Sequence, residues 1–204
     1  MQDNLIIKGE LKPENPLLIM VHGRGASARD IISLADHLSV DNFTLIAPQA
    51  TNHTWYPYSF LAPQNQNQPS LGNALEQLDE ILEMAERAGV KSEKIFFLGF
   101  SQGAGLALEF VARNAKRYGG VIAFTGGLIG DRITEENYEG SFEGTEIYIG
   151  TSDPDPHVPI NRVKETEIVL KKMGAKVKVD IFPNMGHTII QEEIDNAIRI
   201  LKVH

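Results

Sequence analysis

Short apolar segments alternate with stretches of helical periodicity along most of this 204-residue chain. We expect strands at residues 5–8, 17–21, 43–47, 95–98, 119–124, 145–149 and 177–182. We expect one helix from a cap at Ser27 or Asp30 to about residue 38, and others at 70–88, 102–116, 159–173 and 188–201. Continuous apolar runs such as 17–21 are typical of parallel strands that are buried on both faces. The alternation therefore predicts one α/β domain over residues 1–204, with a mostly parallel sheet that helices cover on both faces.

Length, charge and composition exclude several kinds of protein. A chain of this length can bury one sizeable core without disulfides or a metal ion. It contains no cysteine, which rules out a cysteine nucleophile and a thiolate metal site. The net charge of −8 argues against a nucleic-acid partner. Residues 1–8 lack the features of a signal peptide and the apolar run 17–21 is too short to span a bilayer, so we expect no membrane span and a cytoplasmic location. The choice between monomer and homodimer stays open.

The sequence Gly99-Phe100-Ser101-Gln102-Gly103 connects an expected strand to an expected helix. It fits the pattern G-x-S-x-G, in which a sharp strand-to-helix turn exposes the serine oxygen. Such a turn strains the serine backbone, and glycine is needed on both flanks because a β-carbon would clash with neighbouring backbone. The amide of Gln102 would then lie at a helix N-terminus, where unpaired N–H groups favour an oxyanion. For these five residues alone, the competing explanation is a glycine-rich connection whose serine caps the helix.

A serine nucleophile needs a base, and the base needs an orienting carboxylate. His187 follows the last expected strand in a glycine-bearing loop that would bring it toward Ser101. Asp153 and Asp155 follow the strand at 145–149, and a proline follows each of them. Since active sites of parallel sheets lie beyond the carboxyl ends of the strands, these side chains are expected to meet. The order Ser101, Asp153 or Asp155, His187 is that of elbow enzymes and differs from the chymotrypsin and subtilisin types, so the sequence predicts a Ser-His-Asp triad.

The turn His22-Gly23-Arg24-Gly25 follows the strand at 17–21. We expect the backbone N–H of Arg24 to be the second oxyanion donor and His22 to brace the turn. The stretch from Gly23 to Ala28 also fits G-x-G-x-x-A, a dinucleotide-binding pattern. That pattern requires an acidic residue at the end of the next strand, where this chain has Pro48-Gln49. We therefore favour the oxyanion turn and expect no cofactor.

With these motifs, the chain resembles the phospholipase/carboxylesterase group of α/β-hydrolases, which includes the acyl-protein thioesterases. The resemblance extends from Leu17 to the C-terminus and rests on residues 22–25, 99–104, 155–159 and 186–187. It implies the α/β-hydrolase fold, and the insertions leave no room for a large cap domain. It matches Ser101 to the nucleophile, His187 to the base, and the amides of Arg24 and Gln102 to the oxyanion hole. For the acid, Asp155 fits Asp-Pro-x-Val-Pro, while Asp153 fits the spacing from Gly150, and we favour Asp155.

Substrate contacts are expected from the long segment 48–69, which has no periodicity. Its run of aromatic residues begins with Trp55 and Tyr56, which are candidates to line a pocket for an acyl or aromatic leaving group. Alternatively, these rings hold the loop on the surface. Arg24 either places a positive charge beside the site or is solvated. His157 would shape the acid loop, and no metal role is expected for it because no ligand partners are suitably spaced.

The sequence thus predicts a serine hydrolase that cleaves carboxylic esters or thioesters of small to medium acyl groups through an acyl-Ser101 intermediate. Its partner would be a small-molecule ester substrate. Two alternatives remain. One is a small-molecule-binding protein that keeps the hydrolase fold without turnover, and the other is a cofactor-free perhydrolase that uses the same triad.

Overall fold

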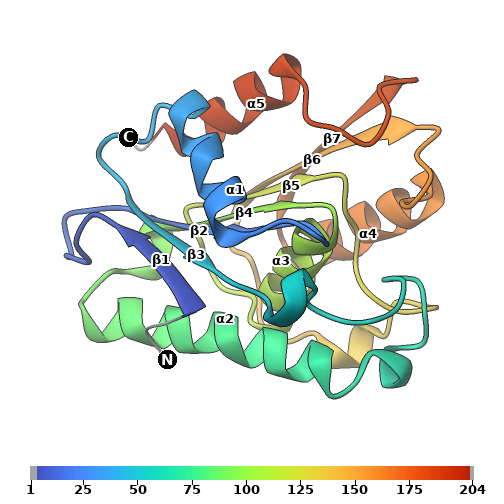
Figure 1. Cartoon of the computed structure of the whole chain (residues 1–204), viewed down its shortest axis with the longest axis horizontal. Helices are drawn as coiled ribbons and strands as arrows, with labels where there is room; N and C mark the ends of the chain where they lie inside the picture. Colours follow the sequence, from blue (N-terminus) through green and yellow to red (C-terminus); the bar gives the residue numbers. More distant parts are fainter. Residues whose placement is uncertain (1–3, 203–204) are drawn as a thin grey trace.

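Seven strands form one sheet in the order β1-β3-β2-β4-β5-β6-β7 (Figure 1). The computed structural model describes residues 4–202, so residues 1–3 and 203–204 of the predicted domain lie outside the described residues. The strands are β1 (Leu5–Lys8), β2 (Leu17–Val21), β3 (Thr44–Pro48), β4 (Ile95–Phe100), β5 (Gly120–Phe124), β6 (Glu146–Asp153) and β7 (Lys176–Pro183). β1 is antiparallel to β3, and the other pairings are parallel. The predicted single α/β domain with a mostly parallel sheet is confirmed.

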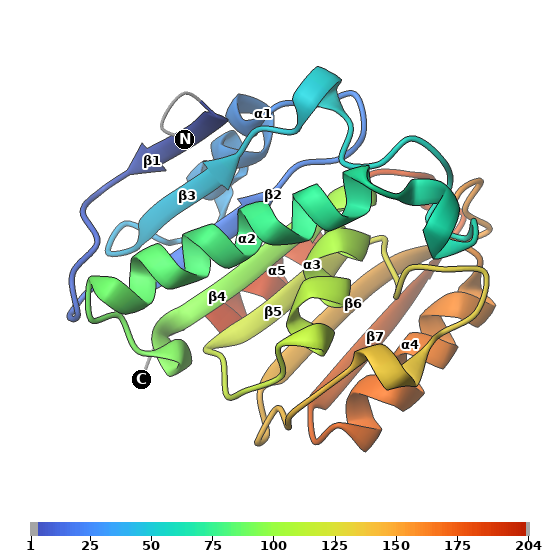
Figure 2. The same cartoon turned by 90° about the horizontal axis from the view of Figure 1, so that it is seen from below.

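Helices cover both faces of this sheet. They are α1 (Ala28–Ser33), α2 (Ser70–Arg87), α3 (Gln102–Arg113), α4 (Ile160–Lys172) and α5 (Gln191–Leu201). Figure 2 shows α2, α3 and α4 over one face, while α1 and α5 lie on the other. Each face has its own cluster of buried apolar side chains, with Leu17 and Ile19 of β2 in one cluster and Leu18 and Met20 in the other. Because both faces of β2 are buried, the strand has no polar side chain, as its sequence indicated.

Two strands extend further than their apolar runs. β4 continues to Phe100, which pairs with Phe124 of β5, and β6 continues to Asp153, which pairs with Pro183 of β7. Glycine and polar side chains interrupt the apolar pattern at these positions, so the sequence pattern ends early. Hydrogen-bonded pairing with a neighbouring strand keeps the extra residues in the strand. The extensions bring the serine turn and the aspartate loop to one edge of the sheet.

Several predicted helix boundaries are wrong by a few residues. The first helix is α-helical only to Ser33 and continues as a 3-10 helix over Leu34–His37. α3 ends at Arg113 and α5 begins at Gln191, so both are shorter than expected. The segment 48–69 contains two short 3-10 helices, Thr51–His53 and Gln64–Asn67. The late start of α5 leaves a longer loop after β7, and this loop carries His187.

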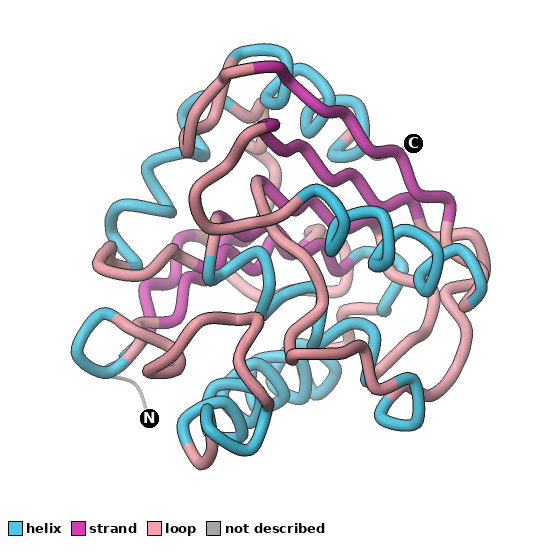
Figure 3. Tube along the Cα trace, turned by 90° about the vertical axis from the view of Figure 1, so that its right-hand side faces the viewer, coloured by secondary structure: helices cyan, strands magenta, loops and turns pink. Residues whose placement is uncertain are grey.

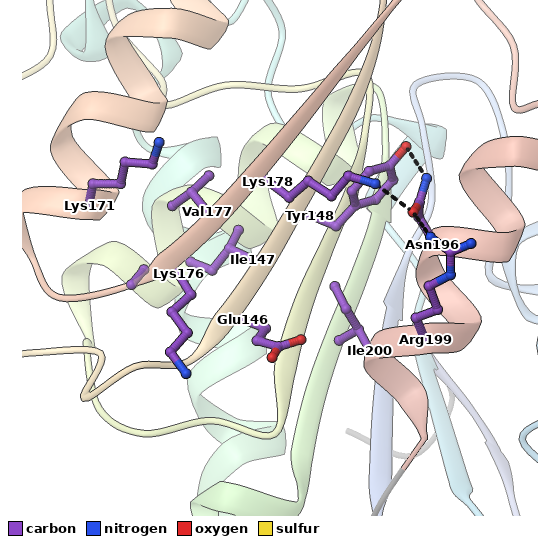
Figure 4. Close-up of a pocket in the computed structure, with 11 residues that line it drawn as sticks. Glu146, Ile147, Tyr148, Lys171, Lys176, Val177, Lys178, Asn196, Arg199 and Ile200 are labelled. Carbon is purple, nitrogen blue, oxygen red and sulfur yellow. Dashed lines mark hydrogen bonds between the residues drawn. The ribbon is translucent and has the colours of Figure 1, made fainter.

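Loops that follow the strands gather at one end of the molecule, which faces the viewer in Figure 3. The opposite end has a separate hollow of about 530 Å³ at the start of β6 and β7, lined by Lys176, Lys178 and Arg199 (Figure 4). Lys178 pairs with Asp180 and donates a hydrogen bond to Asn196. β7 is an edge strand, and lysines on such a strand discourage pairing with another chain. Protection of the edge is therefore sufficient to explain the two lysines of β7, while Arg199 lies on α5.

Candidate active site

Ser101 lies in the turn between β4 and α3. Its backbone has φ 54° and ψ −117°, a conformation that L-residues seldom adopt. The turn is fixed by a 2.9 Å hydrogen bond from the Ser101 amide to the carbonyl oxygen of Phe124. A β-carbon on Gly99 would clash with the carbonyl of Gly103, and one on Gly103 would clash with the carbonyl of Val21. The two glycines are thus needed by the close approach of backbone on both sides of the serine.

Three side chains from separate loops form a continuous chain of contacts. Ser101 Oγ lies 2.8 Å from His187 Nε2, and His187 Nδ1 lies 2.8 Å from Asp155 Oδ2. The Asp155 side chain is 0% exposed and that of His187 is 21% exposed. The amide of Gly186 donates to Ser152 Oγ at 3.0 Å and so ties the histidine loop to β6. This geometry allows His187 to accept the serine proton while Asp155 orients the ring.

Asp155 is held in its ionised form by its hydrogen-bond donors. Burial alone would raise the pKa of this carboxyl, but the hydrogen bond from His187 and those from two backbone amides lower it below its ordinary value. Those amides belong to His157 and Val158, each 2.8 Å from Asp155 Oδ1. Asp153, the alternative acid, is exposed at the end of β6. Its backbone carbonyl accepts a hydrogen bond from Asn184, whereas the carboxylate that reaches His187 is that of Asp155.

Two backbone amides next to Ser101 are candidates for the oxyanion hole. Gln102 is the first residue of α3, and Arg24 lies in the turn after β2. A β-carbon on neighbouring Gly23 would lie 3.5 Å from Cβ of Ser101, so this turn closely approaches the serine. Within the described part of the chain, neither amide donates a hydrogen bond to another group. Both are therefore available to a negatively charged oxygen.

His22 braces the turn after β2, at residues 22–25, from inside the protein. Its Nδ1 lies 2.7 Å from the carbonyl oxygen of Gly23, and its Nε2 accepts a hydrogen bond from the amide of Ala50. Burial lowers the pKa of His22, which favours the neutral ring that this pair of contacts requires. Gln49, where a dinucleotide-binding pattern would need an acid, accepts from the amide of Ala28. Its side chain thus occupies the first amide of α1, where a pyrophosphate would bind.

A cavity of about 600 Å³ opens beside Ser101 and His187. Its lining includes Tyr56, Tyr58 and Phe60 from the segment 48–69, together with Val158 and Pro159 from the segment after β6. Trp55, the other candidate, is not among the residues that line this cavity, and its Nε1 donates to the carbonyl of His22. Trp55 instead supports the turn at residues 22–25, because its ring packs with its centroid 4.8 Å from that of His22.

The contacts of three further side chains could not be predicted from the sequence. The ring of His157 packs edge-on against His187, with centroids 4.9 Å apart. Arg24 is exposed, and its guanidinium donates to backbone carbonyls of residues 56–58. The amide side chain of Gln102 contacts the same loop. These contacts join residues far apart in the sequence, and no periodicity or motif predicts them.

The described residues 4–202 contain no group of three or more His, Asp or Glu side chains that could hold a metal ion. No helix among them is both long and apolar enough to cross a bilayer.

The sheet order, the strained serine between β4 and α3, and the order of the three side chains define an α/β-hydrolase. The family model for phospholipase/carboxylesterase matches residues 2–204, and the chain belongs to this family. It is 47% identical to a phospholipase/carboxylesterase from Dyadobacter fermentans of known crystal structure, with a TM-score of 0.95 over 98% of this chain and 96% of that one. The predicted hydrolase class and family resemblance are confirmed.

Two fungal relatives are more distant but match over most of their length. The acyl-protein thioesterase 1 of Debaryomyces hansenii is 27% identical over 93% of this chain and 91% of its own. That of Saccharomyces cerevisiae is 23% identical, over 98% and 97%. The family therefore includes proteins named for ester and for thioester substrates.

Proposed function

We propose that this chain is a serine hydrolase that cleaves carboxylic esters or thioesters of small to medium acyl groups. The observation that carries the proposal is the pair of 2.8 Å contacts that connects Ser101 through His187 to Asp155. A serine hydroxyl is a weak nucleophile at neutral pH, and a histidine base within hydrogen-bond distance removes this limit. The buried carboxylate keeps a proton on His187 Nδ1, so that Nε2 is free to accept the serine proton.

The reaction takes place in two steps at the same residues. Ser101 Oγ attacks the carbonyl carbon while His187 accepts its proton, and the amides of Arg24 and Gln102 stabilise the oxyanion. His187 then returns the proton to the leaving alcohol or thiol, which leaves an acyl group on Ser101. Water, deprotonated by His187, attacks this acyl-enzyme, the bond between Ser101 Oγ and the acyl carbon breaks, and His187 returns the proton to Ser101 as the carboxylic acid is released. No step needs a cofactor.

The cavity supports an acyl or alcohol group that is largely apolar. Its walls combine the rings of Tyr58 and Phe60 with Val158 and Pro159, and no aspartate or glutamate lines it among the described residues. Apolar walls with a few polar groups are typical of sites for small molecules. The names of the fungal relatives add thioesters to the substrates worth testing.

Hydrolysis of an aryl acetate and of the matching thioacetate tests this proposal. We expect the wild-type protein to release acid from at least one of them, and Ser101→Ala to reduce kcat by at least about 10³-fold, because the nucleophile is lost. A folded Ser101→Ala variant that keeps wild-type activity would place the reaction elsewhere. Formation of peracid from acid and hydrogen peroxide would instead support the perhydrolase alternative.

A further inference from the structure

The side chain of Arg24 is bound to the loop that forms one wall of the cavity. Its Nη1 donates to the carbonyl of Pro57 at 2.9 Å, and its Nη2 donates to the carbonyls of Tyr56 at 2.8 Å and Tyr58 at 2.7 Å. Three consecutive carbonyls thus converge on one guanidinium. A planar group with several fixed donors can hold three acceptors at once, which a lysine ammonium on a flexible stem does less well.

The side chain of Gln102 holds the same loop. Its Oε1 accepts from the amide of Trp55 at 2.9 Å and its Nε2 donates to the carbonyl of Tyr56 at 2.8 Å. Gln102 is only 7% exposed, so these hydrogen bonds are shielded from water. The carbonyl of Tyr56 therefore accepts from both Arg24 and Gln102. We assign the backbone amides of these two residues to the oxyanion hole. Their side chains both bind one backbone atom of the loop at residues 54–58.

The Arg24 amide needs such support more than the Gln102 amide does. Arg24 lies between Gly23 and Gly25, and Gly25 has φ +80°. Glycine on both sides leaves a turn free to adopt several backbone conformations. The Gly25 amide donates a 2.7 Å hydrogen bond to the carbonyl of His53, and the Ala26 amide closes the turn with a 3.2 Å hydrogen bond to the carbonyl of Gly23. These bonds hold the residues around Arg24, and none of them is made by the Arg24 amide itself. Gln102, in contrast, begins a regular helix whose hydrogen bonds hold its backbone.

We propose that Arg24, assisted by Gln102, is a positioning residue that couples the loop at residues 54–58 to the oxyanion hole. The hydrogen bonds of the guanidinium anchor the Arg24 side chain to the loop at the cavity wall, and this anchoring fixes the orientation of the Arg24 backbone amide. The same hydrogen bonds therefore hold both the cavity wall and the oxyanion hole in place. This inference rests on the proposed esterase function. The rival role for Arg24 is recognition of an anionic substrate, since among the described residues it forms no salt bridge. The three carbonyl oxygens that accept hydrogen bonds from Arg24 favour the positioning role.

Kinetics with aryl acetate, aryl hexanoate and an aryl hemisuccinate, which carries a carboxylate, separate the two roles. For Arg24→Ala we expect kcat on the acetate to fall about 10- to 100-fold, because misplacing a catalytic group by about 1 Å has effects of this size. The loss should be similar for all three esters. Arg24→Lys should recover little of it, since one ammonium cannot replace three hydrogen bonds. Gln102→Ala should mainly raise KM for the hexanoate.

Trp55, the only tryptophan of the chain, reports on the loop without reference to activity. Quenching of its fluorescence by acrylamide should increase in Arg24→Ala and Gln102→Ala. Arg29→Ala is the control: Arg29 is exposed on nearby α1, so its loss removes the same charge and should leave both kcat and quenching within about two-fold of wild type.

The possible results distinguish failure of the coupling from failure of the proposed esterase function. Unchanged quenching in Arg24→Ala, or increased quenching with kcat on the acetate within two-fold of wild type, overturns the coupling while the esterase proposal stands. A loss confined to the hemisuccinate and recovered by Arg24→Lys assigns Arg24 to anion recognition and also overturns it. Wild-type protein that hydrolyses none of the esters contradicts the proposed function, and the coupling with it.

Discussion

At the scale of single residues, Glu193 is the carboxyl group whose surroundings differ most from those of an exposed glutamate. This third residue of α5 is 0% exposed, and one carboxylate oxygen accepts a 3.0 Å hydrogen bond from the amide of Ile190. The other oxygen has no protein partner within the described residues. It packs against Gly150, where a β-carbon would clash with it. Burial, with help from Asp180 and Glu192, raises the pKa of Glu193 to about 7, despite the opposing Ile190 hydrogen bond.

Glu193 should therefore make the folded protein less stable as pH rises. The carboxyl titrates at about 4.5 when exposed and at about 7 in the folded state, so between these values the folded state binds more protons and the free energy of unfolding decreases with pH. The full effect, present above pH 7, is on the order of 3 kcal/mol. Urea unfolding at pH 4.5 and pH 8 should show Glu193→Gln gaining stability over wild type mainly at pH 8. An equal difference at both pH values would mean that Glu193 does not titrate in this range.

At the scale of elements, the turn between β4 and α3 carries the tightest steric constraint in the site. The sequence pattern predicted both its glycines and its place between a strand and a helix. The physical cause of the constraint is the approach of α3 to β2, because a β-carbon on Gly103 would overlap the carbonyl of Val21. Gly105, two residues further along α3, would gain a β-carbon 3.3 Å from its nearest neighbour, the carbonyl of Gly127.

Substitution of these two glycines should therefore have unequal effects. We expect Gly103→Ala to lower the free energy of unfolding by about 2–3 kcal/mol or more, since backbone must move to admit the methyl group. Gly105→Ala should cost about 1 kcal/mol or less, because small adjustments relieve its contacts and alanine favours a helix. Thermal unfolding of both variants gives the comparison. Equal losses would show that the fold does not depend on the close approach of α3 to β2.

Element ends were harder to predict than element types. β6 runs to Asp153 and α5 starts at Gln191, and neither boundary follows from local residue preferences. Pairing with β7 extends β6. The start of α5 was harder to predict because Glu193 is buried there, whereas the usual helical pattern places glutamate on the exposed face. The choice between Asp153 and Asp155 was open for the same reason, since it depends on how far the strand extends before the loop turns back.

At the scale of the whole molecule, the parallel sheet explains why chain order predicted the site. Ser101 and His187 are 86 positions apart and Asp155 and His187 are 32 apart, yet each follows a strand whose carboxyl end lies at the same edge. Any chain with these strands in parallel brings those loops together. The contacts of Arg24 and Gln102 with residues 54–58 follow no such rule. They depend on the path of a long loop, which only the three-dimensional structure gives.

The most direct test of the account is the rate at which a fluorophosphonate modifies the protein, followed by peptide mass spectrometry. We expect wild-type protein to take up one label, on Ser101, and Asp155→Asn to slow this reaction by about 10³- to 10⁴-fold because His187 loses its orienting acid. Asp153→Asn should react at close to the wild-type rate, since that side chain is exposed at the end of β6. Folded wild-type protein that takes up no label, or labelling that depends on Asp153 and not on Asp155, would contradict the triad proposed for this hydrolase.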